Sequence, residues 1–273
     1  MIDVIDKIQS FTAMSRLSNS EVITPKNIVK DMVDLLSADV FNPDAKFLDP
    51  AVKSGRFLIE IYYRLMNSPL LAHMPEDERK KHILENQLYG VATSSFAAAI
   101  VRRALYNDPY ETGNIVYTAD KVTKEMIQGA FKVMEFNVVI GNPPYNKDIF
   151  LDFVSMGYDL SSQYTCMITP AKWQTNADNA RTASKISYKQ FREKLVKHIR
   201  HVVFYPDCKD VFEIMQADGI SYYLMDKATH DICIVTNKCD AVSYFNGEKD
   251  RPRPCLKNDT ALYYFNKMAI AAI

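Results

Sequence analysis

The chain of 273 residues lacks a Cys-x-x-Cys pair and any other obvious metal-binding pattern. Its five cysteines and five histidines are scattered, and their spacings match no zinc site. His198 and His201 lie three residues apart, but no acidic or thiol side chain adjoins them. We therefore expect no metal site, and unpaired thiols fit a reducing cytoplasm.

Long apolar runs are also missing. No stretch of 18 apolar residues occurs, so we expect no membrane-spanning helix. The first ten residues, MIDVIDKIQS, carry too much charge for a signal peptide. These absences predict a cytoplasmic protein without a membrane partner.

Neither sign of charge is in excess, because 33 basic residues balance 33 acidic ones. A protein that holds nucleic acid by itself usually carries a basic excess. Any such contact must come from a local basic cluster or from another domain or subunit. With 48% apolar residues, the chain can fill the core of one large α/β domain, with or without a small appendage.

Apolar, β-rich runs alternate with segments of helical spacing. The predicted strands are 46–51, 87–93, 114–120, 136–142, 164–170, 198–205 and 220–226. The predicted helices are 26–37, 55–67, 95–107, 121–130, 147–158 and 186–196. This alternation is typical of a doubly wound, mostly parallel sheet with helices on both faces. Ligands bind beyond the carboxyl ends of the strands in such sheets.

The strongest motif is Gly141-Asn142-Pro143-Pro144-Tyr145, which directly follows a predicted strand. The prolines stiffen the loop and donate no hydrogen bonds, and a residue before proline is held extended. The loop therefore presents the Asn142 side-chain oxygen and the Pro143 carbonyl as acceptors, which suit an NH2 group with two hydrogens. Tyr145 offers a ring on which a planar base can stack, worth ~1–3 kcal/mol. An ordinary Pro-Pro turn is the alternative.

A second motif, Asp49-Pro50-Ala51-Val52-Lys53-Ser54-Gly55, has the pattern of a strand, a tight turn and the start of a helix. Gly55 allows close approach of a ligand to the backbone, and the helix N-terminus favours a carboxylate. Asp49 suits an ammonium group. The alternative is a turn with a structural role alone.

In their order along the chain, these motifs resemble those of the gamma-class amino-methyltransferases of restriction-modification systems. The chain looks closest to the branch in which methylase and nuclease share one polypeptide. The segments that carry the resemblance are Thr24-Pro25, 49–58, Asn142-Pro143-Pro144-Tyr145, 168–173, Phe191-Arg192 and Asp210-Val211-Phe212. It covers residues 20–230.

The resemblance implies the Rossmann-like fold of S-adenosylmethionine-dependent methyltransferases, with a seven-stranded mixed sheet. The implied strand order is 3-2-1-4-5-7-6, with strand 220–226 antiparallel to its neighbours. The methyltransferase catalytic domain is expected over residues 1–237, with an N-terminal helical cofactor region over 1–40. Residues 238–273 are expected to form a linker or the start of a further domain, truncated at its apolar end.

The resemblance further implies methyl transfer from S-adenosylmethionine to N6 of an adenine flipped out of double-stranded DNA. Asn142, Pro143, Pro144 and Tyr145 are the catalytic residues on this interpretation, and Tyr145 and Phe212 stack on the base. Phe212 alternatively belongs to the core. The residues expected to bind the cofactor are Thr24, Asp49, Pro50, Ala51, Gly55, Thr93 and Asp120.

Three positions depart from the family pattern or leave an alternative open. Lys53 stands where most relatives have glycine. The acid that usually ends the second strand and binds the ribose is replaced by Thr93-Ser94-Ser95. Asp120 fits the position expected to meet the adenine amine of the cofactor, but a helix N-cap explains it equally well.

Basic residues concentrate in 172–200, and Lys172, Arg181 and Lys185 are the predicted contacts to the DNA backbone. A solvated helix face is the alternative. The recognised sequence requires a target-recognition domain or subunit beyond this chain. Three other functions stay open: a non-catalytic subunit that binds cofactor and DNA, a protein-glutamine methylase and an N4-cytosine methylase.

Overall fold

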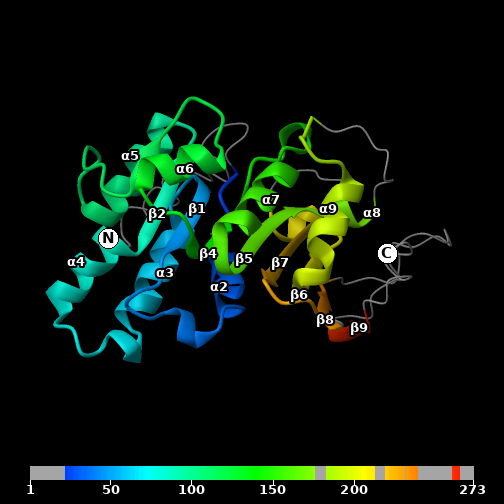
Figure 1. The fold of residues 1–273 in the computed structure, drawn as a ribbon, viewed down its shortest axis with the longest axis horizontal. Helices are drawn as coiled ribbons and strands as arrows, with labels where there is room; N and C mark the ends of the chain where they lie inside the picture. Colours follow the sequence, from blue (N-terminus) through cyan, green and yellow to red (C-terminus); the bar gives the residue numbers. More distant parts are fainter. Residues whose placement is uncertain (1–21, 176–182, 213–218, 231, 239–259, 265–273) are drawn as a thin grey trace.

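The computed structural model describes residues 22–175, 183–212, 219–230, 232–238 and 260–264. Within these residues, a nine-stranded sheet has the order β3-β2-β1-β4-β5-β7-β6-β8-β9 (Figure 1). The strands are β1 (Phe47–Val52), β2 (Leu88–Ala92), β3 (Ile115–Tyr117), β4 (Phe136–Gly141), β5 (Ser161–Pro170), β6 (Ile199–Tyr205), β7 (Ile220–Asp226), β8 (Ile232–Asn237) and β9 (Thr260–Tyr264).

The predicted order of the first seven strands is confirmed. Strand β7 runs antiparallel to both β5 and β6, as expected, whereas β1 to β5 are mutually parallel. The expected count of seven is wrong, because β8 pairs with β6 and β9 pairs with β8. The six-residue run of β8 did not stand out, since a short apolar run has no distinctive period. In the fold it covers the edge of β6, which would otherwise expose unpaired backbone groups.

Helices lie on both faces of the sheet, as the strand-helix alternation predicted. Those in the described residues are α2 (Lys26–Asp34), α3 (Arg56–Met66), α4 (Glu76–Asn86), α5 (Ser95–Tyr106), α6 (Lys124–Phe131), α7 (Phe150–Leu160), α8 (Lys172–Thr175) and α9 (Tyr188–Leu195). Helix α4 was not predicted, because only Ile83 and Leu84 are buried and its apolar stripe is narrow. No helix among the described residues has the length and apolar character of a membrane span.

Two hydrophobic clusters sandwich the sheet. Helices α2, α3, α4 and α5 contribute to one cluster, and α6, α7 and α9 contribute to the other. Successive residues of β4 alternate between them: Val138 and Ile140 belong to the first cluster and Val139 to the second. This alternation follows from the two-residue period of a strand, and it explains why β4 is apolar on both sides.

The carboxyl ends of β1, β2, β3 and β4 lie at the same edge of the sheet because these strands are parallel. Phe47 of β1 is in register with Val138 of β4, so the residues that follow the two strands are neighbours. This pairing brings the two predicted motifs together.

The predicted boundary at residue 237 coincides with the end of β8, and the division of the chain into domains stays a prediction.

Candidate active site

Asp49 lies on β1, directly beside Gly141 at the end of β4. Its side chain is 3% exposed, and its Oδ1 accepts a hydrogen bond from the Ala51 N–H at 3.0 Å. A Cβ added to Gly141 would lie 2.7 Å from Asp49 Oδ1. The glycine before Asn142 therefore leaves the space that the Asp49 carboxyl occupies.

Burial raises the pKa of the Asp49 carboxyl to about 7, although the Ala51 N–H and the Lys53 ammonium both favour its ionised form. A buried carboxylate near a cavity is costly unless a cation compensates it. Asp49 is therefore suited to binding a positively charged group.

The turn after β1 is shaped by Gly55, the N-cap of α3. Gly55 has a φ of 77°, in the left-handed region, and a Cβ there would lie 3.0 Å from Val101 Cγ1. Both the conformation and the contact favour glycine. The chain reverses tightly at this point and starts α3 beside the end of β1.

Asn142 follows β4 and is 2% exposed. Its Nδ2 donates a hydrogen bond to Thr24 Oγ1 at 3.1 Å. Its Oδ1 is buried and accepts no hydrogen bond from the described residues. A buried acceptor without a partner is rare and costly, so Asn142 presents an unused acceptor at the end of a central strand.

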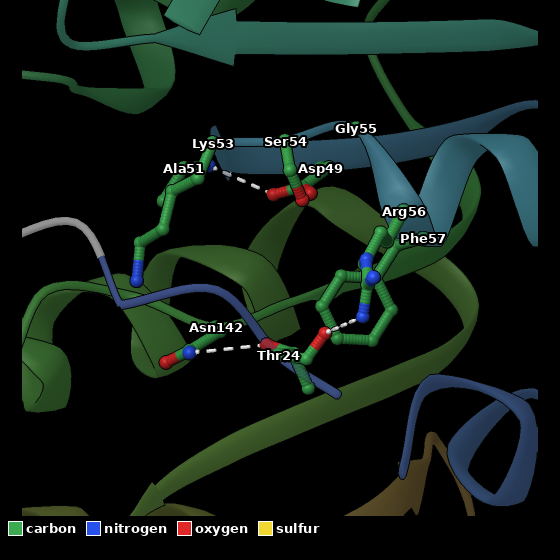
Figure 2. A pocket seen from close by; sticks show the side chains of 9 residues that line it. All are labelled: Thr24, Asp49, Ala51, Lys53, Ser54, Gly55, Arg56, Phe57 and Asn142. Atoms are coloured by element: carbon green, nitrogen blue, oxygen red, sulfur yellow. Dashed lines mark hydrogen bonds between the residues drawn. The ribbon is translucent and has the colours of Figure 1, made fainter. Parts of the chain in front are cut away.

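Thr24 is held in turn by Arg56, the first residue of α3. Arg56 Nη1 donates to the Thr24 carbonyl at 3.0 Å, and this bond joins residues 32 positions apart. Both side chains are buried. Figure 2 shows the resulting sequence of contacts from Arg56 through Thr24 to the Asn142 amide.

Pro143 is buried, whereas Pro144 and Tyr145 are partly buried. The Tyr145 hydroxyl donates to the Ile168 carbonyl of β5 at 3.3 Å, and its ring packs against both hydrophobic clusters. Burial raises the pKa of this hydroxyl well above its usual range, so it stays a neutral donor. The ring is thereby anchored beside the loop that carries Asn142.

A narrow pocket of about 10 Å³ opens between these residues, lined by Thr24, Asp49, Ala51, Lys53, Ser54, Gly55, Arg56, Phe57 and Asn142. In Figure 2, the Lys53 side chain extends from the turn toward Asn142 and toward the separate segment that carries Thr24. The pocket therefore has a carboxyl group, Asp49, and an ammonium group, Lys53, in its wall. That pair of charges matches those of a zwitterion, but a volume of about 10 Å³ holds only about one water, so an amino-acid group would fit only after the turn opens.

Residues of the same loop also line a wider cavity of about 700 Å³. Pro144 lines it, as do Thr93 after β2 and Asp120 after β3. The N-cap alternative for Asp120 is wrong, because the Thr123 side chain caps α6 by accepting from the Met126 N–H. Pro50 is buried in β1 near Gly141 and lines neither cavity among the described residues.

The predicted DNA contacts and Phe212 do not all lie at the two cavities. Lys172 pairs with Asp148, with Nζ and Oδ1 3.2 Å apart. Lys185 is exposed at the rim of the wider cavity, and Arg181 lies outside the described residues. Phe212 is 3% exposed and belongs to the first hydrophobic cluster, so stacking on a base would require its surroundings to move. Its role stays a prediction.

Sequence reasoning missed the role of Arg56 and the contact between Thr24 and Asn142. The sequence signal for Arg56 was its position at the start of an apolar helix. An arginine is seldom buried without partners, so a buried one there indicates a hydrogen-bonding role. The loop after Tyr145 also went unrecognised. Lys147 and Asp148 both have positive φ values, 53° and 62°, which non-glycine residues seldom adopt.

The fold and the site together define a class. Parallel strands in the order 3-2-1-4-5 followed by an antiparallel β7 form the sheet of the Rossmann-like methyltransferase fold. A model of the N-6 DNA Methylase family matches residues 7–188, more than half of the chain. The chain belongs to this family, and its enzyme class is that of the adenine-specific DNA methyltransferases.

A curated relative supports this assignment. The chain is 28% identical over 295 aligned positions to an uncharacterized adenine-specific methylase of Mycoplasma pneumoniae. The alignment covers 77% of this chain and 68% of that protein.

Solved structures show the same fold. A modification subunit of a putative type I restriction enzyme from Vibrio vulnificus matches with a TM-score of 0.60 and 15% identity, over 89% of this chain and 51% of that one. The EcoKI M protein, of a type I restriction enzyme, matches with a TM-score of 0.61 and 13% identity, over 81% and 50%. The type IIG restriction endonuclease BpuSI matches with a TM-score of 0.54 and 15% identity, over 86% of this chain and 29% of that one. This chain thus spans between 29% and 51% of each of these proteins.

Proposed function

We propose that this chain transfers a methyl group from S-adenosylmethionine to the N6 amine of adenine in DNA, as the modification component of a restriction-modification system. The observation that carries the proposal is the Asn142 side chain. Its buried Oδ1 has no partner among the described residues, while Nδ2 is engaged by Thr24. The site therefore offers an acceptor where an amine has to be bound.

An adenine amine is a weak nucleophile, because its lone pair is delocalised into the ring. Asn142 Oδ1 accepts one of its hydrogens, and the Pro143 carbonyl accepts the other. Holding both hydrogens out of the ring plane returns the lone pair to nitrogen and directs it away from the loop. No general base is needed, because the nitrogen loses its proton to water after the methyl group has been transferred.

The base has to leave the duplex, because N6 cannot reach a buried site from within the base stack. Tyr145 provides the stacking surface for it, and the bond to the Ile168 carbonyl holds that ring in place. Lys172 and Lys185 remain the proposed phosphate contacts, with Arg181 in the segment outside the described residues. Phe212 is kept as a second stacking partner that becomes available only when its surroundings move.

The residues around the two cavities fit the cofactor. When bound, S-adenosylmethionine would supply an electrophilic methyl group, with its sulfur as the leaving group that keeps the electron pair. Asp49 and Lys53 line the narrow pocket, where Asp49 would accept from the ammonium of the methionine part and Lys53 would pair with its carboxylate. Thr93 and Asp120 line the wider cavity, where they would hold the adenosine part, with Thr93 in place of the usual ribose-binding acid.

The finer classification also belongs to the proposal. The cofactor turn at 49–58 precedes the catalytic loop at 142–145, which is the order of the gamma class. The branch with methylase and nuclease in one polypeptide is proposed on the sequence pattern of the cofactor turn. A target-recognition domain or subunit outside this chain would choose the DNA sequence, and double-stranded DNA and a cytoplasmic location are proposed with it.

The test is a methyl-transfer assay with labelled S-adenosylmethionine and unmethylated genomic DNA, followed by mass spectrometry of the nucleosides. We expect N6-methyladenine, and we expect Asn142→Ala to lower the single-turnover rate roughly 10²–10³-fold, as one lost positioning contact does. N4-methylcytosine in the same digest would establish the cytosine alternative, and methylation of glutamine would have to be sought in a parallel assay with a protein substrate. Binding of cofactor and DNA without any transfer would indicate a non-catalytic subunit.

A further inference from the structure

The loop that carries Asn142 continues into a short turn, Asn146–Asp148, just before α7. Lys147 and Asp148 both have positive φ values, a conformation that residues other than glycine seldom adopt. The Asp148 N–H donates to the Tyr145 carbonyl at 3.2 Å. Asp148 is therefore bonded directly to the aromatic residue on which the target base is proposed to stack.

The side chain of Asp148 forms an ion pair with Lys172, whose Nζ lies 3.2 Å from Asp148 Oδ1. Lys172 is one of the residues proposed to contact the DNA backbone, yet its ammonium is held by a carboxylate of the chain itself. The side chain of Lys172 is 29% exposed and that of Asp148 is 14% exposed. Because the lysine is the more exposed partner, a phosphate can reach the ammonium without unfolding its surroundings.

The two partners are supported differently. Lys172 is the first residue of α8, and the next residue, Trp173, is 5% exposed and donates from Nε1 to Ser221 Oγ at 3.3 Å. Arg192 Nη1 donates to the Trp173 carbonyl at 2.9 Å. The ammonium therefore projects from a firmly held base, whereas Asp148 lies on a turn of unfavourable backbone conformation. A phosphate that binds Lys172 would displace the Asp148 side chain and leave α8 in place.

DNA is a strong competitor for such an ammonium, since the duplex carries one negative charge per about 1.7 Å of its axis. An ion pair between two partly exposed side chains contributes little to stability and is weakened by salt. The chain as a whole has no basic excess that would attract DNA. A carboxylate that neutralises one of its few DNA-facing cations therefore lowers the affinity for DNA.

We propose that Asp148 is an internal competitor for DNA: its carboxylate holds the Lys172 ammonium until a phosphate of the strand that carries the target adenine takes its place. This inference rests on the proposed function, which brings that strand to the loop with Asn142. The exchange releases the Asp148 side chain from α8 when the backbone is bound. Contact with the phosphate is thereby linked to the freedom of the turn that follows Tyr145.

The experiment compares four proteins, which are the native chain, Asp148→Asn, Lys172→Met and the double variant. Asparagine has nearly the shape of aspartate and tolerates positive φ values equally well, so Asp148→Asn removes the charge and keeps the turn. Methionine keeps most of the aliphatic stem of lysine and removes the ammonium. The probe is a short fluorescein-labelled duplex with one adenine opposite an abasic site, because an unpaired base leaves the stack at lower cost. Fluorescence anisotropy at several salt concentrations, beginning at low salt, gives each Kd.

Asp148→Asn should bind the duplex roughly three- to eightfold more tightly than the native chain, because the ammonium no longer has to leave a carboxylate. In the Lys172→Met background, the same change should improve binding less than about 1.5-fold. That remaining gain measures the general effect of one negative charge fewer near DNA, and the difference between the two backgrounds isolates the competition.

The salt dependence separates exchange from a permanent ion pair. Lys172→Met should make the slope of log affinity against log salt concentration shallower by about 0.9, since one phosphate contact is lost. The native chain and Asp148→Asn should share the steeper slope, because in both proteins the ammonium ends on a phosphate. A native chain that shares the shallow slope of Lys172→Met would show that the ammonium stays on Asp148, and it would overturn the exchange.

A matched control is the ion pair between Lys194 and Asp159, in which Nζ and Oδ2 are 2.7 Å apart. Asp159 lies near the other end of α7, about 16 Å further along the chain direction at 1.5 Å per residue. Asp159→Asn should change the affinity for the duplex less than about 1.5-fold. Trp173 is the only tryptophan in the sequence, so its emission spectrum reports whether α8 is intact in every variant.

Three results would overturn the proposal: an equal gain from Asp148→Asn in both backgrounds, weaker binding by Asp148→Asn, or no binding of the duplex by the native chain and Asp148→Asn at low salt. Weaker binding would show that Asp148 presents the ammonium to DNA and does not compete for it. The proposed function fails separately, if the native chain binds the duplex but forms no N6-methyladenine. The binding series still decides the exchange in that case.

Discussion

Gly141 and Asp49 are in contact across neighbouring strands, so that a single added carbon on Gly141 would lie 2.7 Å from Asp49 Oδ1. The loop proposed to carry catalysis and the turn proposed to bind the cofactor are therefore in close contact, because position 141 has no side chain. Gly141 thus belongs to the proposed cofactor site as well as to the loop.

Gly141→Ala should displace the Asp49 carboxyl and weaken S-adenosylmethionine binding by about tenfold or more, with ~1–3 kcal/mol lost from the free energy of unfolding. Calorimetry and denaturant titration measure the two effects. The matched control is Gly129→Ala on α6, where an added Cβ meets nothing within 4 Å. That change should leave binding unaltered and stabilise the helix slightly. Native affinity in a folded Gly141→Ala protein would contradict the assignment of Asp49.

Asp49→Asn should stabilise the fold at alkaline pH while it removes cofactor affinity. The folded-state pKa of about 7 lies above the ordinary 3.8, so the contribution of Asp49 to stability is full below 3.8 and is lost as pH rises through 7. Asparagine is neutral throughout. The free energy of unfolding of the variant should therefore exceed that of the native chain by up to ~4 kcal/mol at pH 8, and this difference should vanish near pH 4. Urea titrations at the two pH values measure it.

The same titration predicts the pH dependence of binding. Asp49 has to be ionised to hold the ammonium of the cofactor, so the affinity of the native chain should rise as pH increases through about 7. Calorimetry with S-adenosylhomocysteine, which carries the same ammonium, should show this rise, and Asp49→Asn should bind weakly with no such dependence. A flat profile in the native protein would show that Asp49 does not contact the ammonium.

Lys53→Met should lower the affinity for S-adenosylmethionine about tenfold, since it removes the charge paired with the carboxylate. Decarboxylated S-adenosylmethionine lacks that partner, so both proteins should bind it equally. Lys30→Met, at an exposed position of α2, is the control and should change neither affinity. A similar loss for both ligands would assign Lys53 to the shape of the pocket and not to recognition of the carboxylate.

Tyr145→Ala should cost more than Tyr145→Phe. Phenylalanine keeps the ring and loses only the bond to the Ile168 carbonyl, so the methylation rate should fall less than about tenfold. Alanine also loses the stacking surface, worth ~1–3 kcal/mol. Fluorescence of 2-aminopurine at the target position reports whether the flipped base is still captured. Equal rates for the two variants would show that the ring does not stack on the base.

The sheet and the two motifs were predictable because each depends on local pattern. Apolar runs bounded by turns located β1 and β4, and the parallel arrangement then placed Asp49 and Asn142 at one edge. Helix α4 and the outer strands β8 and β9 escaped prediction for the opposite reason. Few side chains of α4 are buried, so its hydrophobic pattern is faint, and β8 and β9 are short strands defined by their pairing.

The contacts that orient the site were not predictable, because they join distant parts of the sequence. Thr24 and Asn142 are 118 positions apart in the sequence, and Arg56 and Thr24 are 32 positions apart. Nothing in the local sequence of Thr24 indicates that its hydroxyl binds an amide in another loop. Gly141 was recognised as part of a motif, but its reason for being glycine is visible only when β1 and β4 are paired.

Thr24 lines the pocket proposed for the methionine part of the cofactor, and its hydroxyl also holds the amide proposed to receive the base. The two binding equilibria therefore share one side chain. Thermodynamic linkage makes any resulting cooperativity reciprocal: whatever factor the cofactor applies to the affinity for an extrahelical adenine, the adenine applies to the affinity for the cofactor.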